Sequence, residues 1–281
     1  MIELKKITIY MEVIMKKQEE KTKIIYAEAI KFLYKNAPEG ISAQQVEEYF
    51  NISKNFKTKN DILFRLLSSL QNRQMVSNII GFNNIQRQPI FNYILFEYDC
   101  NKILNTYNEE TLFEKFQDNF AIKNIESRSN LWRRYASSVI SACEFLNKFN
   151  DAKDFDNFVK IFTYNELSSA SLPMLLKIEI DGIGFPLACD FLKELGYDQY
   201  PKPDVHIIDI FSAFGLCENN EYSAYKAVIE MANLVNATPY KVDKIFWLIG
   251  SGNYYYDNIR GGANKQNFIE AVKEILNSNY E

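Results

Sequence analysis

The residues best suited to chemistry lie in the stretch 177–216. An apolar segment ends near Glu179, and a turn with two glycines, Gly182 and Gly184, leads into a second segment with helical periodicity. Both glycines can adopt positive φ and let the backbone approach another group closely. Backbone N–H groups of such a turn, at the start of a helix, form a site for a phosphate. The turn therefore predicts an anion-binding site made of backbone N–H groups, which needs no lysine or arginine.

A single carboxylate follows in the segment YPKPDVH, which runs from Tyr200 to His206. Two prolines hold the chain extended, and Asp204 stands where a helix over 205–214 is expected to begin. Asp is a common N-cap, and that structural role is compatible with a chemical one. A helix N-terminus favours the ionised carboxylate, which is the form needed to stabilise a cationic sugar or to activate a water.

These two segments together resemble the motifs of the helix-hairpin-helix DNA glycosylase superfamily, which includes endonuclease III and the adenine, alkyladenine and 8-oxoguanine glycosylases. The sequence IDGIG over 180–184, with Ala188 four residues on, resembles the family hairpin L-P-G-V-G-x-x-x-A. The sequence PDVH over 203–206 is similar to the later family segment V-D-[TV]-H. The fold implied is mainly α.

Flanking helices extend the resemblance over residues 57–255. The stretch 131–140 resembles the helix that precedes the family hairpin, and 66–74 resembles an early helix and turn where a polar side chain wedges into the duplex. An enzyme that acts on a base must first extrude it, at a cost of about a few kcal/mol. The resemblance implies that Gln71 or Asn72 fills the gap left by that base. Read without the resemblance, both are surface residues at a helix end.

The resemblance also implies a mechanism. Asp204 would stabilise an oxocarbenium-like transition state and orient a water for attack at the anomeric carbon, leaving an abasic site. The phosphate beside the target nucleotide in double-stranded DNA would be held by the backbone amides of Gly182, Ile183 and Gly184. In the family, hairpin carbonyls bind a metal ion that bridges to that phosphate. By position, a monovalent or divalent cation would here bind the carbonyls of Ile178, Ile180 and Ile183.

The sequence departs from the family pattern at several positions. Bifunctional members place a Schiff-base lysine where Pro186 stands, so the resemblance implies a monofunctional glycosylase. A displaced lysine, Lys202 or Lys177, is the bifunctional alternative. No cysteine follows Cys217, so no iron–sulfur cluster is expected, and no organic cofactor is implied. Asp181 replaces the hairpin proline and brings an acid near the expected phosphate.

Two other classes of protein remain open. A non-catalytic DNA-binding protein would use the hairpin for backbone contacts alone, but it would have no need for Asp204. A helical protein–protein adaptor would use the paired glycines only as a tight turn, and it would show no salt-dependent affinity for DNA.

Composition limits these alternatives. The net charge of −4 weighs against DNA binding through a uniformly basic surface, although local groups exist at Lys57, Lys59, Arg65 and Arg73 and at Arg128, Arg133 and Arg134. Each group taken alone is as well explained as a solvated helix face. Four scattered cysteines, no apolar run long enough for a membrane span and no signal peptide favour a cytoplasmic protein, which we expect to be a monomer.

Helical periodicity dominates the rest of the chain. An apolar stripe over 21–35 predicts one helix, and Ser42 with Gln45 forms a capping box for a short second one. The segment 7–13 is the best strand pattern, and it is weak. The first 55 residues are expected to form a helical appendage, either winged-helix-like or made of ordinary packing helices, before a glycosylase-like domain over 56–281. Further helices are predicted over 60–70, 109–120, 130–148, 155–162, 222–235, 239–249 and 265–277.

A few single residues invite chemical roles that structural roles explain better. His206, the only histidine, is interpreted as a structural residue. Aromatic side chains such as Trp132, Trp247 and the run 254–256 could stack on a base, but abundant aromatics usually form the core. Asp190 and Asp209 are interpreted as helix-surface acids.

Overall fold

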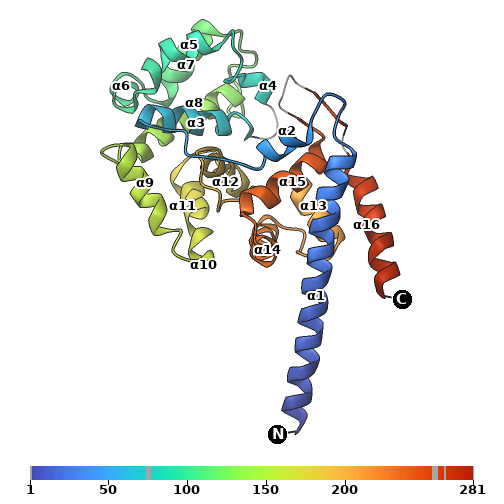
Figure 1. Ribbon diagram of the computed structural model, residues 1–281. Helices are drawn as coiled ribbons and strands as arrows, with labels where there is room; N and C mark the ends of the chain where they lie inside the picture. Colours follow the sequence, from blue (N-terminus) through green and yellow to red (C-terminus); the bar gives the residue numbers. More distant parts are fainter. Residues whose placement is uncertain (1, 74–76, 255–258, 263, 281) are drawn as a thin grey trace. The chain divides into compact units, whose positions relative to one another are not determined.

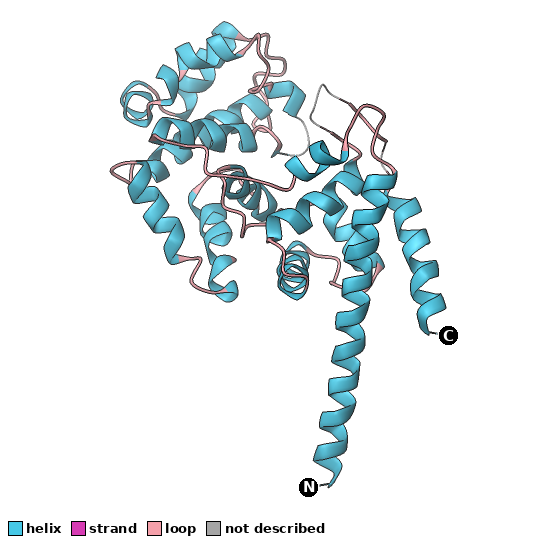
Figure 2. Cartoon of the chain, in the orientation of Figure 1, coloured by secondary structure: helices cyan, strands magenta, loops and turns pink. Residues whose placement is uncertain are grey.

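The computed structural model describes residues 2–73, 77–254, 259–262 and 264–280. In these residues the regular elements are helices, with a single isolated bridge between Asn253 and Arg260 and no extended strand (Figure 2). The chain forms two compact units (Figure 1). The terminal unit combines Met1–Ile52 with Pro201–Glu281, and the central unit is Ser53–Tyr200. The mainly α fold expected from the periodicity is thus confirmed.

The terminal unit is built around the C-terminal half of α1. In that half Ile25, Ala29 and Leu33 are buried against α15 and α16, as the apolar stripe predicts. Aromatic side chains, Phe246 and Phe268 among them, fill the same core. The helices of the unit are α1 (Ile2–Lys35), α2 (Ala43–Glu48), α13 (Val205–Ala213), α14 (Glu221–Leu234), α15 (Pro239–Ser251) and α16 (Lys265–Tyr280).

The N-terminal segment corrects one sequence expectation. Residues 7–13 lie inside α1 and are helical, so the weak strand prediction there was wrong. No glycine or proline separates this segment from the packed half of α1, so the helix, once formed, propagates through it. Residues 2–52 contain helices and no strand. A winged helix needs strands for its wing, so the alternative of ordinary packing helices agrees better with this segment.

Local capping signals fixed several helix starts. Ser42 accepts from the Gln45 N–H at 3.2 Å, and Gln45 Oε1 accepts in return from the Ser42 N–H, which confirms the predicted capping box. Thr238 caps α15, and Pro239 occupies its first position. The domain division predicted at residue 55 stays a prediction. The compact units follow another division of the chain: Met1–Ile52 packs with Pro201–Glu281, and Ser53–Tyr200 forms the other unit.

The central unit packs α3 against α8 and α12. The predicted apolar face of α3 is fully buried: Ile62, Leu63, Leu66 and Leu67 are inaccessible to solvent. The elements of this unit, in order, are α3 (Lys59–Leu70), α4 (Ser77–Ile80), α5 (Gln88–Ile94), η2 (Phe96–Tyr98), α6 (Cys100–Thr106), α7 (Glu109–Asn119), α8 (Leu131–Leu146), α9 (Ala152–Ile161), α10 (Glu166–Ser169), α11 (Ser171–Glu179) and α12 (Phe185–Glu194).

A buried polar contact ties α3 to α12 and corrects another expectation. Asp190 was interpreted as a helix-surface acid, but it is buried. Its carboxylate accepts from Ser69 Oγ at 2.9 Å and lies 3.6 Å from the Arg65 guanidinium. Asp190 is buried because α12 turns this face toward α3, where a cation and a hydroxyl offset the loss of hydration. Trp132, by contrast, is a core residue as expected, stacked on Phe120 with ring centroids 4.5 Å apart.

Candidate functional site

The hairpin turn between α11 and α12 has the geometry expected from its glycines. The helix α11 ends at Glu179, and Gly182 adopts φ +84°, a conformation that other residues take only with strain. Gly184 is the N-cap of α12 and has no side chain with which to cap the helix. Pro186 lies in the first turn of α12, as predicted. The first backbone N–H groups of α12 therefore donate no hydrogen bond to an N-cap side chain and are available to an outside acceptor.

Serines of α8 hold this turn in place. Ser137 Oγ donates to the Asp181 carboxylate at 2.9 Å, and Ser141 Oγ accepts from the Asp181 N–H at 2.9 Å. A Cβ atom built on Gly182 would lie only 2.6 Å from Ser138 Oγ. The turn therefore packs directly on one face of α8, and Gly182 is required for space as well as for its dihedral angle. The Asp181 carboxylate thus has a hydrogen-bond partner on α8.

The predicted cation ligands lie along this turn. The Ile180 carbonyl accepts from the Ile183 N–H at 3.5 Å, a long bond that leaves a lone pair on the oxygen for another partner. Ile178 is at the end of α11 and is largely exposed. Carbonyl oxygens are hard ligands that suit alkali, magnesium or calcium ions, so the donor set fits such a cation. Cation binding at Ile178, Ile180 and Ile183 stays a prediction.

The two predicted wedge residues differ in accessibility. Gln71 is buried at the end of α3, where its Nε2 donates to the Ser68 carbonyl at 3.1 Å and its Oε1 accepts from the Asn83 N–H at 3.4 Å. Asn72 is half-buried, with one long bond of 3.4 Å to the Ser68 carbonyl. Gln71 would have to break two bonds to enter a duplex, so Asn72 is the better placed of the two. Gln74, part of the same predicted stretch, lies outside the described residues.

Asp204 is the N-cap of α13, which confirms its predicted structural role. Its Oδ1 accepts from the His206 N–H at 2.9 Å and from the Ile207 N–H at 3.3 Å. Among the described residues no hydrogen bond reaches Oδ2, and the side chain is only half-buried. The carboxylate is thus held in one orientation through one oxygen, while the other is left for an outside partner.

His206 packs beside Asp204 in a structural setting. A Cβ atom built on Gly250 of α15 would lie 2.6 Å from His206 Cβ, so α13 and α15 approach closely at this point. Burial lowers the pKa of His206, and the nearby Lys265 and Lys202 act in the same direction, against Asp204 and Asp209. Its Nδ1 is buried and has no hydrogen-bond partner among the described residues. A neutral imidazole in this setting agrees with the structural interpretation.

The remaining candidates near α13 are engaged in ion pairs and hydrogen bonds. Asp209, expected to be a surface acid, accepts from the Lys265 ammonium and remains partly exposed. The Lys202 N–H donates to the buried carboxylate of Asp243 at 2.7 Å, which fixes the chain just before Asp204. Lys265 and Asp243 were not anticipated, because a lysine near the C-terminus and an acid within an apolar helix give no local signal.

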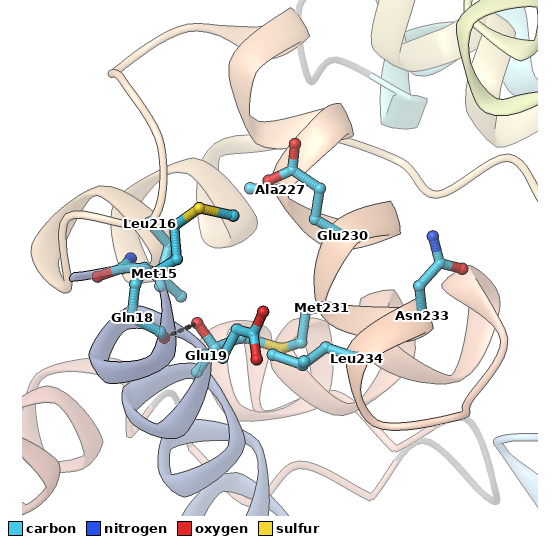
Figure 3. Close-up of a pocket in the computed structure, with 10 residues that line it drawn as sticks. Met15, Gln18, Glu19, Leu216, Ala227, Glu230, Met231, Asn233 and Leu234 are labelled. Carbon is cyan, nitrogen blue, oxygen red and sulfur yellow. Dashed lines mark hydrogen bonds between the residues drawn. The ribbon is translucent and has the colours of Figure 1, made fainter. Parts of the chain in front are cut away.

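A separate cavity of about 590 Å³ lies in the terminal unit between α1 and α14 (Figure 3). Apolar side chains, Met15, Met231 and Leu234 among them, line it together with polar ones that include two carboxylates, Glu19 and Glu230. It includes none of the residues predicted from the sequence. Its acids would repel a nucleic-acid phosphate. The cavity therefore has no part in the candidate site.

The candidate residues thus fall into two groups, one in each compact unit. The hairpin, Gln71 and Asn72 belong to the central unit, and Asp204 to the terminal unit. Sequence reasoning did not anticipate how close Arg73 comes to the hairpin: its Nη1 would lie 2.8 Å from a Cβ atom on Gly182. Only the packing of the end of α3 against the hairpin and α8 brings these distant parts of the sequence together.

Comparison with solved structures defines the class of fold. The chain has the all-helical fold of helix-hairpin-helix DNA glycosylases, as the sequence resemblance implied. No protein-family model matches the sequence, and neither does any curated protein.

Solved structures that it resembles include 8-oxoguanine DNA glycosylases. The enzyme Tm1821 of Thermotoga maritima is 18% identical, with a TM-score of 0.53, over 81% of this chain and 96% of that protein. The 8-oxoguanine glycosylase/lyase of Methanocaldococcus jannaschii, in complex with DNA containing 8-oxoguanine, is 20% identical, with a TM-score of 0.49, over 78% of this chain and 94% of that protein.

Proposed function

We propose that this protein is a monofunctional DNA N-glycosylase that removes a damaged, modified or mismatched base from duplex DNA. The observation that carries the proposal is Asp204, capping α13 through one carboxylate oxygen and offering the other. A non-catalytic protein that used the hairpin only to bind DNA would not need this carboxylate. The shared fold with an 8-oxoguanine glycosylase supports the proposal and makes 8-oxoguanine the first base to test.

In the proposed reaction the base is flipped out of the duplex, and Asn72 or Gln71 occupies the gap. The hairpin amides of Gly182, Ile183 and Gly184 hold a phosphate near the target nucleotide. As the glycosidic bond breaks, positive charge develops on the sugar, and the ionised Asp204 stabilises it. Asp204 Oδ2 orients a water that attacks the anomeric carbon, so that free base and an abasic site result.

A cation at the carbonyls of Ile178, Ile180 and Ile183 would add positive charge beside the bound phosphate. No step of the proposed chemistry depends on it. The carbonyls and the amides of the turn would then act on the same phosphate from the same loop.

Pro186 supports the proposal of hydrolysis without strand cleavage. A lyase reaction needs a free amine to form a Schiff base with the sugar, and the pyrrolidine ring at this position has none to offer. Lys177 and Lys202 are the displaced alternatives. Treatment with borohydride during turnover would trap a covalent adduct if either acted in this way, and such an adduct would contradict the monofunctional assignment.

The direct test is incubation of the protein with duplexes that each carry one lesion: 8-oxoguanine, an alkylated adenine, uracil or a mismatch. Alkali then converts abasic sites into strand breaks. We expect cleavage after alkali for at least one lesion and none without it. If no lesion is excised while the duplex is still bound, the protein is a DNA-binding module instead. If it neither excises nor binds, the adaptor interpretation holds.

A further inference from the structure

Two arginines of the central unit lie at or beside the residues that contact the hairpin turn, and neither has an acidic partner among the described residues. Arg73 follows α3, and its Nη1 would lie 2.8 Å from a Cβ atom on Gly182. Arg134 lies in the first turn of α8, one helical turn before Ser138, which contacts the same glycine. Arg73, Arg134 and Ser138 line one small pocket. Both residues are partly buried. Within the described residues neither has a carboxylate within ion-pair distance, whereas Arg65 and Arg133 do.

The other arginines around them have polar partners within the fold. Arg65 pairs with Asp190 at 3.6 Å, and Arg87 donates to the carbonyls of Ile79 and Ile80 at 2.8 and 2.6 Å. Most telling is Arg133, the immediate neighbour of Arg134 on α8.

Arg133 forms an ion pair with Glu110 and stacks on the Phe113 ring, with its guanidinium carbon 4.2 Å from the ring centroid. Two adjacent arginines on one helix therefore have different environments. Arg133 is paired within the fold, whereas Arg134 lines the pocket that it shares with Arg73 and Ser138 and has no carboxylate within ion-pair distance among the described residues.

An arginine pair at this place offsets an electrostatic problem. Asp181 brings a negative charge to the turn, and the chain as a whole carries a net charge of −4. Both would disfavour a phosphate at the hairpin amides. The two positive charges of Arg73 and Arg134 outweigh the one negative charge of Asp181, so the local charge becomes positive. Arginine is suited to phosphate because its planar fork of donors matches two oxygens at once.

We propose that Arg73 and Arg134 form a clamp for the DNA phosphodiester backbone at the hairpin, so that this acidic protein holds DNA with side-chain charge as well as with backbone amides. The inference rests on the proposed binding of DNA. In this proposal the positive charges of Arg73 and Arg134 offset the negative charge that Asp181 brings to the phosphate site.

The test is the salt dependence of binding to an undamaged duplex, measured by fluorescence anisotropy, so that nothing is turned over. Each arginine that neutralises a phosphate contributes about 0.9 to the slope of log affinity against log salt concentration. We expect R73Q and R134Q each to lower the slope by about 1 and the double variant by about 2. Each single change should weaken binding about tenfold at low salt.

The matched control is R133Q, which removes an arginine from the same helix but from a satisfied pair. It should leave the slope unchanged. The variants R73K and R134K, which keep the charge, should restore most of the slope. Circular dichroism of every variant checks that the fold is intact. The clamp is disproved if the double variant keeps the wild-type slope, or if R133Q lowers it as much as R134Q does.

The outcome is separable from that of the proposed reaction. If the arginines set the slope but no lesion is excised, the clamp stands and the glycosylase assignment fails. If a lesion is excised and the slope does not depend on the arginines, the glycosylase assignment stands and the clamp fails.

Discussion

The chain uses two helix N-termini in opposite ways. At α12 the N-cap is Gly184, which has no side chain, so it offers no acceptor to the first N–H groups. At α13 the N-cap is Asp204, whose Oδ1 accepts from two of those groups. The same structural element is thus open to an outside anion in one place and occupied by its own carboxylate in the other. We therefore expect the N-cap side chain to decide whether a helix start can accept an outside anion or is occupied by its own carboxylate.

Removal of the charge at α13 should have the largest effect. Asp204→Asn keeps an acceptor for the His206 and Ile207 N–H groups, so the fold and DNA affinity should be retained. The loss of transition-state stabilisation should lower the excision rate about 10²–10³-fold. Single-turnover kinetics on the preferred lesion, with anisotropy for binding, measure the two effects. Full activity in this variant would disprove the role of Asp204.

Conversion of α12 into a copy of α13 is the complementary change. Gly184 adopts φ −91° and ψ 169°, which any residue can take, and a Cβ there meets only Pro186 Cδ at 3.8 Å. Gly184→Asp should therefore cap α12, raising stability by about a few tenths of a kcal/mol. It should also repel a phosphate and weaken DNA binding about 10–100-fold.

Urea unfolding would measure the gain in stability of Gly184→Asp, and fluorescence anisotropy would measure its loss of DNA affinity. Gly184→Asn, which caps without the charge, should match the gain in stability with a smaller loss of affinity. If the Asp variant binds DNA like the wild type, the turn is not the anion site.

The left-handed glycine of the hairpin provides a third test. Gly182→Ala would be strained at φ +84° and would place Cβ 2.6 Å from Ser138 Oγ, so either the Ser138 side chain or the turn must shift. We expect a loss of stability of about 2 kcal/mol, together with weaker DNA binding. Gly215→Ala, at φ +64° with open space around the added atom, should lose only about 1 kcal/mol. Equal losses in urea unfolding would mean that contact with α8 is unimportant.

The smallest effect expected is a dependence of stability on pH. Burial lowers the pKa of His206, so the unfolded chain binds its proton at a higher pH than the folded one. The contribution of His206 to stability is therefore present above the unfolded pKa of about 6.5 and is lost as pH falls through the folded pKa. The difference in unfolding free energy between wild type and His206→Gln, followed from pH 7 downward, isolates this term. A difference that does not change with pH would contradict it.

Local signals made much of this molecule predictable from the sequence. Capping residues such as Ser42, Thr238 and Asp204 mark helix starts through interactions with their nearest neighbours in the chain, and the apolar stripe of α3 defines its buried face. The short helices α5 and α6 were missed because seven residues are too few for a clear period. Asp190 was misinterpreted because its partners, Arg65 and Ser69, are distant in sequence.

The same limit applies to the candidate site. The dihedral angle of Gly182 and the cap at Asp204 follow from residue type and spacing. The burial of Gln71, the approach of Arg73 to the hairpin and the pair of Lys265 with Asp209 depend on which helices meet. No window of one sequence carries that information.

The buried contact of Asp190 with Ser69 and Arg65 has a mechanical consequence. The helix α3 ends at the turn that bears Asn72 and Arg73, and α12 begins at the hairpin. Asp190 links α12 to α3 through its contacts with Ser69 and Arg65. These contacts therefore help to set the distance between the two parts of the protein that we expect to touch the same stretch of DNA. Breaking them on heating would weaken DNA binding before the domain unfolds. Affinity and heat resistance should then rise or fall together in variants of Asp190, which is buried inside the protein.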